Sequence, residues 1–149
     1  MHRGPTEEEF KNYDGMHCRN IWCNLDDCWQ CPVCERDKKQ ILQWGKRKGS
    51  NARIYGSEGW KAAIHKHHDH GGDIFNLHQA RFEPTYICGA CNQLDARLKK
   101  SLGLNKGYSF SPHEMNLCLK KVEPNQPIKS EFIDFDKARA IALLNHWIT

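Results

Sequence analysis

The stretch Tyr86-Ile-Cys-Gly-Ala-Cys-Asn92 contains two cysteines separated by two residues, with an amide side chain directly after the second cysteine. The same spacing occurs earlier in the chain, at Cys31-Pro-Val-Cys34. Four thiolates from two such pairs complete a tetrahedral zinc site that leaves no position for solvent. The two pairs therefore predict a closed structural zinc site that staples two distant segments, with the ligands Cys31, Cys34, Cys88 and Cys91.

The assignment of the first pair has an alternative, because Cys28-Trp-Gln-Cys31 has the same spacing and overlaps it. The Cys31–Cys34 pair is preferred, since its small Pro-Val turn suits a tight bend around sulfur. Four of the eight cysteines are then left over. Cys18, Cys23 and Cys28 either form a second zinc site with His17 or Cys118, or are reduced buried thiols.

Composition favours one small domain, since the chain has 149 residues, of which 39% are hydrophobic. A hydrophobic core this small often needs a structural metal ion or disulfides to stabilise it. The sequence shows no apolar signal-peptide region and no long apolar run, so a cytoplasmic protein without a membrane segment is expected, in a bacterial or phage-infected host cell. Close cysteine pairs in a reducing compartment hold metal more often than they form disulfides. The net charge of +4 is compatible with nucleic acid.

Local patterns in the first half predict two helices. Thr6 and Glu9 match a capping box, which begins a helix that runs to about Tyr13. Three further expectations are an irregular Cys-rich stretch over 18–34, a short helix over 36–47 with Ile41, Leu42 and Trp44 on its inner side, and a basic loop over 45–53.

The second half predicts two strands and three helices, which makes the fold class α+β. Strands are expected over 60–65 and 85–87, with a turn at Gly71-Gly72 between them. Leucines at spacing four predict a helix over 92–102, with Leu94, Leu98 and Leu102 on one side. Another helix begins with Ser111 as N-cap, Pro112 at the first position and Glu114 at the third. A core-facing stripe is predicted on the last helix, formed by Ala138, Ile141, Leu144 and Ile148.

Four of the nine histidines lie within six positions, in the run His65-Lys-His67-His68-Asp69-His70. Protonated imidazoles repel one another at this density, so a metal ion or a phosphate is a natural partner for the cluster. The alternative is a solvated, histidine-rich loop that binds metal only incidentally.

The run His67-His68-Asp69-His70, followed by Tyr86-Ile-Cys-Gly-Ala-Cys-Asn92, resembles the signature of the HNH (His-Me finger) endonucleases. The layout is similar to that of zinc-containing, phage recombination endonuclease VII-like nucleases. The resemblance covers about Cys31 to Met115, including Phe110-Ser-Pro-His-Glu-Met115. It implies a ββα-metal core over about 31–115 within a single domain of residues 1–149. A Cys-rich segment over 1–30 and a helical segment over 116–149 would flank that core.

The resemblance also implies roles for individual residues. His68 matches the general base, while His67 and Asn92 match the two protein ligands of a catalytic divalent ion, expected to be magnesium or manganese. His70 matches a supporting position. The implied activity is hydrolysis of phosphodiester bonds in duplex or branched DNA, as a restriction enzyme or a phage nuclease. A homodimer is plausible, because cutting both strands symmetrically needs two sites.

Basic side chains in two segments are candidates for holding the DNA backbone. The alternative for each is an ordinary solvated charge. Trp44 and Tyr55 are candidates for stacking on bases, although core packing is the commoner role for such residues. The DNA-binding candidates are Arg97, Lys99 and Lys100 after Asn92, and Lys46, Arg47, Lys48 and Arg53 in the basic loop.

Other zinc proteins fit less well. A zinc deaminase needs a His-x-Glu motif and a proline before the second cysteine pair, but no glutamate follows any of the histidines from His65 to His70, and Ile87 precedes Cys88. The spacing from Cys34 to His65 excludes a C2H2 finger. The remaining alternative to the endonuclease is a non-catalytic zinc-containing module that binds nucleic acid.

Overall fold

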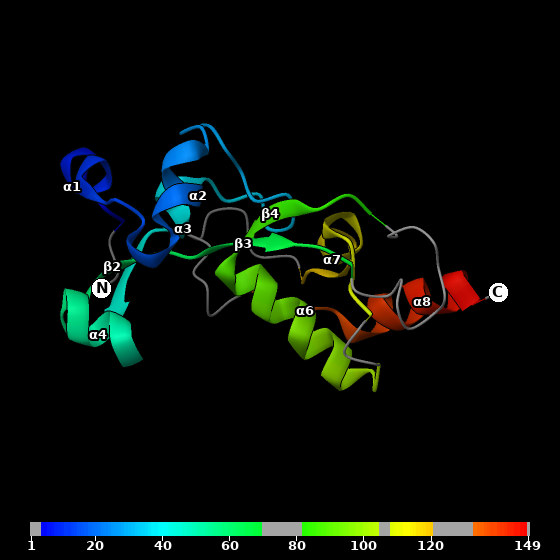
Figure 1. Cartoon of the computed structure of the whole chain (residues 1–149). Helices are drawn as coiled ribbons and strands as arrows, with labels where there is room; N and C mark the ends of the chain where they lie inside the picture. The colour runs from blue at the N-terminus through cyan, green and yellow to red at the C-terminus, as the bar shows by residue number, and fades with distance from the viewer. Residues whose placement is uncertain (1–3, 70–81, 105–107, 121–132, 149) are drawn as a thin grey trace. The chain divides into compact units, whose positions relative to one another are not determined.

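The computed structural model describes residues 4–69, 82–104, 108–120 and 133–148 (Figure 1). They form short helices and two separate two-stranded sheets, so the predicted α+β class is confirmed. The chain divides into two compact units. Unit 1 comprises Met1–Gln30 and Arg36–Ile64, and unit 2 comprises Cys31–Glu35 and His65–Thr149. Unit 2 contains the first cysteine pair and most of the core predicted over 31–115.

Unit 1 begins with α1 (Glu7–Asn12) at the predicted capping box, in which Thr6 and Glu9 hold each other's backbone N–H. The stretch after it was predicted to be irregular, and this was wrong for its first part. A 3-10 turn, η1 (Met16–Cys18), leads into the helix α2 (Arg19–Asn24).

A distant lysine binds the C-terminal end of α2. The buried ammonium group of Lys38 donates hydrogen bonds to the carbonyl oxygens of Trp22 at 2.7 Å and Leu25 at 3.1 Å, at the end of that helix. These carbonyls have no partner within the helix itself. The buried Trp22 ring also packs edge-on against Phe10 and Tyr13. Both contacts join residues far apart in sequence, and local pattern does not reveal them.

The helix predicted over 36–47 is only partly present. It ends early, as α3 (Lys38–Ile41), and the next residues form a strand, β1 (Gln43–Lys46). β1 pairs antiparallel with β2 (Glu58–Lys61), which places Trp44 opposite Trp60. Ile41 and Leu42 are buried as predicted, but Trp44 is 49% exposed because strand pairing turns it away from the core.

The basic loop predicted over 45–53 is also regular structure, because it contains the end of β1 and most of α4 (Gly49–Tyr55). The single strand predicted over 60–65 is divided between β2 and the next strand, β3 (Ile64–His67). Strand pairing supplies the partners that define both boundaries, since β2 pairs with β1 and β3 pairs with β4.

In unit 2, β3 pairs with β4 (Thr85–Cys88), which confirms the predicted return strand. β4 continues directly into α6 (Gly89–Ser101). The buried leucines Leu94 and Leu98 fix its inner face as predicted, whereas Leu102 follows the helix and is half-buried. The turn predicted at Gly71-Gly72 lies outside the described residues.

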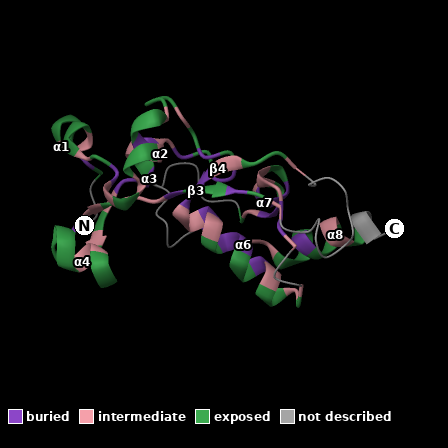
Figure 2. Ribbon diagram, viewed as in Figure 1, coloured by how far each residue is buried: buried purple, intermediate pink, exposed green. Residues whose placement is uncertain are grey.

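Two further helices pack together in unit 2: α7 (Pro112–Cys118) and α8 (Lys137–Ile148). The predicted cap of α7 is confirmed, because Ser111 and Glu114 form a reciprocal capping box with Pro112 at the first position. Buried residues occur in both helices and in the segments that precede them (Figure 2). They include Met115 in α7, Ala140 in α8, and Phe110 and Ile133 before these helices.

The stripe predicted on the last helix was assigned to the wrong face. Ala140 is fully buried, whereas Ala138 and Ile141 are exposed and Leu144 is half-buried. The backbone just before α8 is bound to the end of α7, because Asp136 N–H donates to the carbonyl oxygen of Cys118 at 2.6 Å. The side chain of Ile148 lies outside the description.

Among the described residues, no helix has the length and apolar character needed to cross a membrane.

Candidate metal centre and histidine site

Four cysteines of unit 2 converge on one point. Cys31, Cys34, Cys88 and Cys91 are all buried, and their Sγ atoms lie within 4.8 Å of one another. The Sγ atoms of Cys34 and Cys88 are 3.7 Å apart. A tetrahedral zinc with Zn–S bonds of about 2.3 Å requires sulfur atoms about 3.8 Å apart. The cluster thus fits a structural zinc ion, and no carboxylate or histidine is needed to complete it.

The structure also decides between the two overlapping pairs, because the cluster includes Cys34 and excludes the exposed Cys28. Backbone geometry shapes the chosen pair. Glu35 N–H donates to the carbonyl oxygen of Cys31 at 2.7 Å, and Glu35 itself has a positive φ of 65°. This tight turn points both sulfur atoms to the same side.

The second pair bridges a strand and a helix, since Cys88 ends β4 and Cys91 lies in the first turn of α6. The N–H of Cys88 points at the Sγ of Cys31, 3.4 Å away. Such a bond stabilises negative charge on the sulfur. The site therefore joins the residue 31–34 turn to the strand–helix junction.

A residue distant in sequence supports the first pair, and its position was not predicted. Asn116, on α7, donates from Nδ2 to the carbonyl oxygen of the buried Val33 at 2.7 Å. Val33 lies between the two cysteines, so α7 anchors the turn that presents them. No motif predicts this bond, because the two residues are 83 positions apart.

The four thiols lie so close together that each changes the pKa of its neighbours. A hydrogen bond from Cys31 lowers the pKa of Cys88 to about 7, while hydrogen bonds to Cys34 and Cys88 raise the pKa of Cys31. A hydrogen bond to Cys31 likewise raises the pKa of Cys91. Four thiolates at these distances repel strongly unless a cation lies between them. A bound zinc ion would supply that charge, and its binding would release protons.

The remaining cysteines do not form a comparable group. Cys23 and Cys28 are exposed and Cys18 is half-buried, while Cys118 is buried in unit 2. Within the described part of the chain, the four-cysteine cluster is the one set of three or more His, Cys, Asp or Glu side chains close enough to hold an ion. The structure therefore lends no support to a second zinc site.

The histidine run places His67 and His68 in different environments at the end of β3. His67 is 5% exposed, and its Nε2 lies 2.6 Å from the carbonyl oxygen of Phe110. Because a carbonyl oxygen only accepts, Nε2 carries the proton and donates it. The ring also stacks on Phe82, with centroids 5.2 Å apart and planes at 17°. The tautomer and the ring orientation of His67 are thereby both fixed.

A buried network holds the residue that His67 contacts. Phe110 N–H donates to Asp95 Oδ1 at 2.9 Å, and the other oxygen of Asp95 lies 2.8 Å from Lys99 Nζ. Lys99 also donates to the hydroxyl oxygen of Ser109 at 3.4 Å. Sequence analysis did not single out Asp95, although its spacing of four from Lys99 is a recognisable helix pair.

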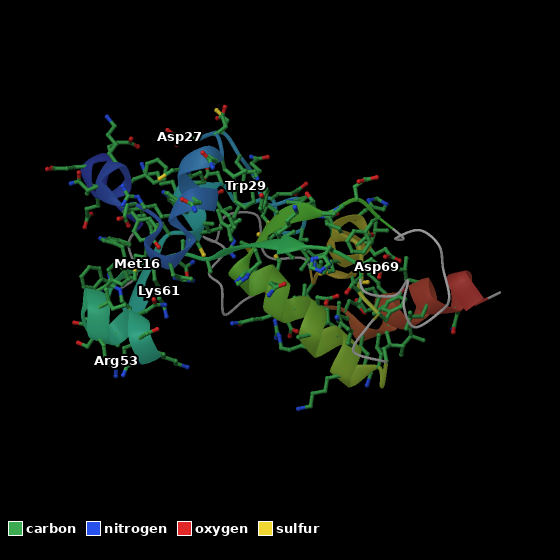
Figure 3. The ribbon with its side chains drawn as sticks, in the orientation of Figure 1. Met16, Asp27, Trp29, Arg53, Lys61 and Asp69 are labelled. Atoms are coloured by element: carbon green, nitrogen blue, oxygen red, sulfur yellow. The ribbon has the colours of Figure 1, made fainter. Side chains whose placement is uncertain are left out.

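His68 is exposed, and its Nδ1 lies 3.4 Å from the carbonyl oxygen of Lys66. Asn92 is half-buried in the first turn of α6, directly after Cys91 of the four-cysteine cluster. Asp69, labelled in Figure 3, ends the described part of the run. The candidate His70 lies outside the described residues.

The basic candidates divide into two groups. Arg97 donates to the carbonyl oxygen of Ile133 at 2.6 Å, Arg47 donates to several carbonyls, and Lys99 is paired with Asp95. These three cations have partners within the chain itself. The side chains that remain exposed as DNA-binding candidates are Lys46, Lys48, Lys100 and Arg53.

Comparison with known proteins found no matching family model, no matching curated protein and no matching solved structure.

Proposed function

We propose that this chain is a metal-dependent HNH endonuclease that hydrolyses phosphodiester bonds in DNA. The observation that carries the proposal is the order of elements around the candidate residues. β3 ends with His67 and is followed by His68, β4 pairs with β3, and α6 begins at the cysteine pair and presents Asn92 in its first turn. This strand–strand–helix order is the one that the resemblance implies.

The environment of His67 supports its proposed role as a metal ligand. Histidines that bind metal usually donate their other ring N–H to a carbonyl or carboxylate, which fixes the tautomer. In His67 the N–H on Nε2 is held by Phe110, so the lone pair on Nδ1 is the remaining ligand position. The side-chain oxygen of Asn92 would be the second protein ligand, and a divalent ion would keep its other positions for water and phosphate oxygens.

The exposure of His68 supports its role as general base. An exposed imidazole within reach of a bound water can accept a proton from it. The carbonyl of Lys66 lies beside Nδ1, which favours a proton on that nitrogen and leaves Nε2 to act as the base. A bound magnesium or manganese ion would supply charge stabilisation at the scissile phosphate and the leaving oxygen.

The four-cysteine zinc site would have a structural role in this enzyme. It holds the strand–helix junction from which Asn92 projects, one residue after Cys91. Loss of this zinc would therefore displace a proposed catalytic ligand, although zinc takes no part in the chemistry.

The direct test is cleavage of supercoiled plasmid by zinc-loaded protein with added magnesium or manganese. Wild type is compared with His68→Ala and with His113→Ala, which removes another exposed histidine of unit 2. Nicking or linearisation by wild type and His113→Ala, with little or none by His68→Ala, is expected. Zinc content is measured in all three, so that loss of folding is not mistaken for loss of the base.

One observation favours a second candidate, a zinc-containing module that binds nucleic acid without cutting it. A deeply buried histidine that contacts a carbonyl and an aromatic ring is also what a purely structural histidine looks like. Binding of DNA by the folded, zinc-loaded wild type, without cleavage of plasmid, branched or site-specific substrates, would select this alternative. Sedimentation of the same samples tests the proposed homodimer.

A further inference from the structure

The positive charge of this chain is concentrated in one segment of unit 1. Residues 43–57, here called the basic segment, contain four cations and no aspartate or glutamate. The chain has 22 lysines and arginines and 18 acidic residues, so the other 18 cations balance the 18 acids. The whole net charge of +4 therefore equals the charge of this segment. The exposed Glu58 borders this segment opposite Lys46 in the β1–β2 pair, and the excess of positive charge within the segment favours a partner of opposite charge.

One of the four cations, Arg47, stabilises the fold of the segment through hydrogen bonds to backbone carbonyls. The guanidinium group of Arg47 donates to the carbonyl oxygens of Tyr55 at 2.7 Å, Glu58 at 3.1 Å and Trp60 at 3.0 Å. These bonds tie α4 and β2 to the end of β1. Gly59 makes room for the guanidinium, because a Cβ atom there would overlap it. The Arg47 side chain thus ties the segment to β2 and holds it in a defined shape.

The other three cations face solvent. Lys46 lies at the end of β1, Lys48 precedes α4, and Arg53 lies within α4, where Figure 3 labels it. All three side chains are exposed, and α4 has no buried residue (Figure 2). They present charge to a partner without first having to break contacts that support the fold.

Exposed apolar side chains occur in the same segment. Among the described residues, five large hydrophobic side chains are exposed, and three of them lie here: Trp44 at 49%, Ile54 at 70% and Tyr55 at 43%. Trp44 meets Trp60 edge to face, with centroids 5.5 Å apart, which orients its ring. Aromatic rings interleaved with cations are the combination that binds single-stranded nucleic acid, since bases stack on the rings and phosphates pair with the cations.

We propose that the basic segment of unit 1 binds single-stranded DNA, with Lys46, Lys48 and Arg53 on the phosphates and Trp44 stacked on an unpaired base. The choice of DNA depends on the proposed function, but binding by unit 1 is separate from cleavage by unit 2. A protein that binds through this segment and cuts nothing would refute the nuclease alone. If the protein cuts DNA but its affinity for DNA is unchanged by substitutions in the basic segment, only the single-strand-binding proposal is refuted.

The test measures binding of a fluorescent oligonucleotide by anisotropy, using zinc-loaded full-length protein without added magnesium or manganese. The main variant is Lys46→Gln/Lys48→Gln/Arg53→Gln. Its matched control, Lys11→Gln/Arg19→Gln/Lys137→Gln, removes the same charge from exposed positions elsewhere. Trp44→Leu tests stacking, and each protein is also measured with the oligonucleotide annealed to its complement.

Single-strand binding depends on salt with a slope of about 0.7 for each phosphate contact, so losing three contacts should lower the slope by about 2. Trp44→Leu should weaken binding to the single strand roughly 5- to 100-fold. The control should retain both the slope and the affinity. Equal losses in the control would show that only net charge matters. Tighter binding to duplex, with no effect of Trp44→Leu, would likewise overturn the proposal. Unchanged zinc content and melting temperature establish that the variants are folded.

Discussion

The Nε2 atom of His67 donates a hydrogen bond to the carbonyl oxygen of Phe110 at 2.6 Å, and this bond links β3 to the segment just before α7. Phe110 is held in turn by Asp95 on α6, through a bond of 2.9 Å to its N–H. The orientation of the proposed metal ligand thus depends on a carboxylate that never touches the metal.

We expect Asp95→Ala to weaken manganese binding at His67 and Asn92 by about 10- to 100-fold, the usual effect of removing a group that orients a ligand. Titration with manganese, followed by electron paramagnetic resonance, measures this change. Asp95→Asn retains an acceptor for Phe110 N–H and should lose less. Gln93→Ala, at an exposed position of the same helix, is the control. If wild type binds manganese and Asp95→Ala binds it equally well, Asp95 has no such role.

Substitutions of two nearby cysteines, Cys31 and Cys28, should have different effects on zinc binding. Cys31→Ser removes a ligand from the buried cluster, whereas Cys28→Ser changes an exposed thiol outside it. We expect one zinc per chain in wild type and in Cys28→Ser. Cys31→Ser should lose both the zinc and most of the thermal stability of unit 2, because the metal contributes directly to folding. Elemental analysis and thermal unfolding test this, and full zinc in Cys31→Ser would contradict the assigned cluster.

Asn116→Ala should destabilise the protein by about 1–3 kcal/mol, because it leaves the buried carbonyl of Val33 without its donor. Denaturant unfolding of the zinc-loaded protein measures the change, and the rate of zinc transfer to a chelator should rise as well. The neighbouring exposed residue Leu117 provides the control variant, Leu117→Ala. Equal stability of Asn116→Ala and wild type would show that the bond to α7 is dispensable.

Tyr13 makes stability in alkaline solution depend on pH. Its hydroxyl donates to the carbonyl oxygen of Ala62 at 3.2 Å and accepts from the N–H of that residue at 3.0 Å. Burial raises the pKa of Tyr13 to about 12, from 10.0. A group whose pKa is raised on folding contributes stability that is fully present below the unfolded pKa, and lost as pH rises through the folded one. The free energy of unfolding should therefore fall between about pH 10 and pH 12.

Tyr13→Phe should show a smaller fall over that range, in parallel unfolding measurements from pH 8 to pH 12. Lysines also titrate there, so the difference between the two proteins isolates the tyrosine. Identical pH profiles would mean that the phenol ionises equally easily in the folded and unfolded states.

Features that depend on near neighbours were predictable from sequence. The capping boxes at Thr6 and Ser111 need only residues three positions apart, and the cysteine pairs need only a two-residue turn. The helix that carries Leu94 and Leu98 follows from their spacing. In each case the residues that determine the structure lie within one turn of each other.

Features that depend on distant partners were missed. The end of α2 is bound by the ammonium group of Lys38, and β1 is paired with β2. At the histidine site, His67, His68 and Asn92 were predicted from the sequence, but the contact of His67 with the carbonyl of Phe110 was not. A backbone carbonyl has no sequence signature, because every residue has one, and only the fold selects which one is used.

The division of the chain has a consequence for how the protein is made. The turn that contains Cys31 and Cys34 belongs to unit 2, yet residues of unit 1 flank it on both sides. The ribosome therefore completes all of unit 1 while this turn still has only two of its four sulfur ligands. A zinc ion bound by the four cysteines could not be enclosed until Cys88 and Cys91 emerge, and during that interval the first two thiols would be open to oxidation or to the wrong metal. The yield of correctly assembled protein should thus depend on the redox state and zinc supply of the cell during synthesis of its second half.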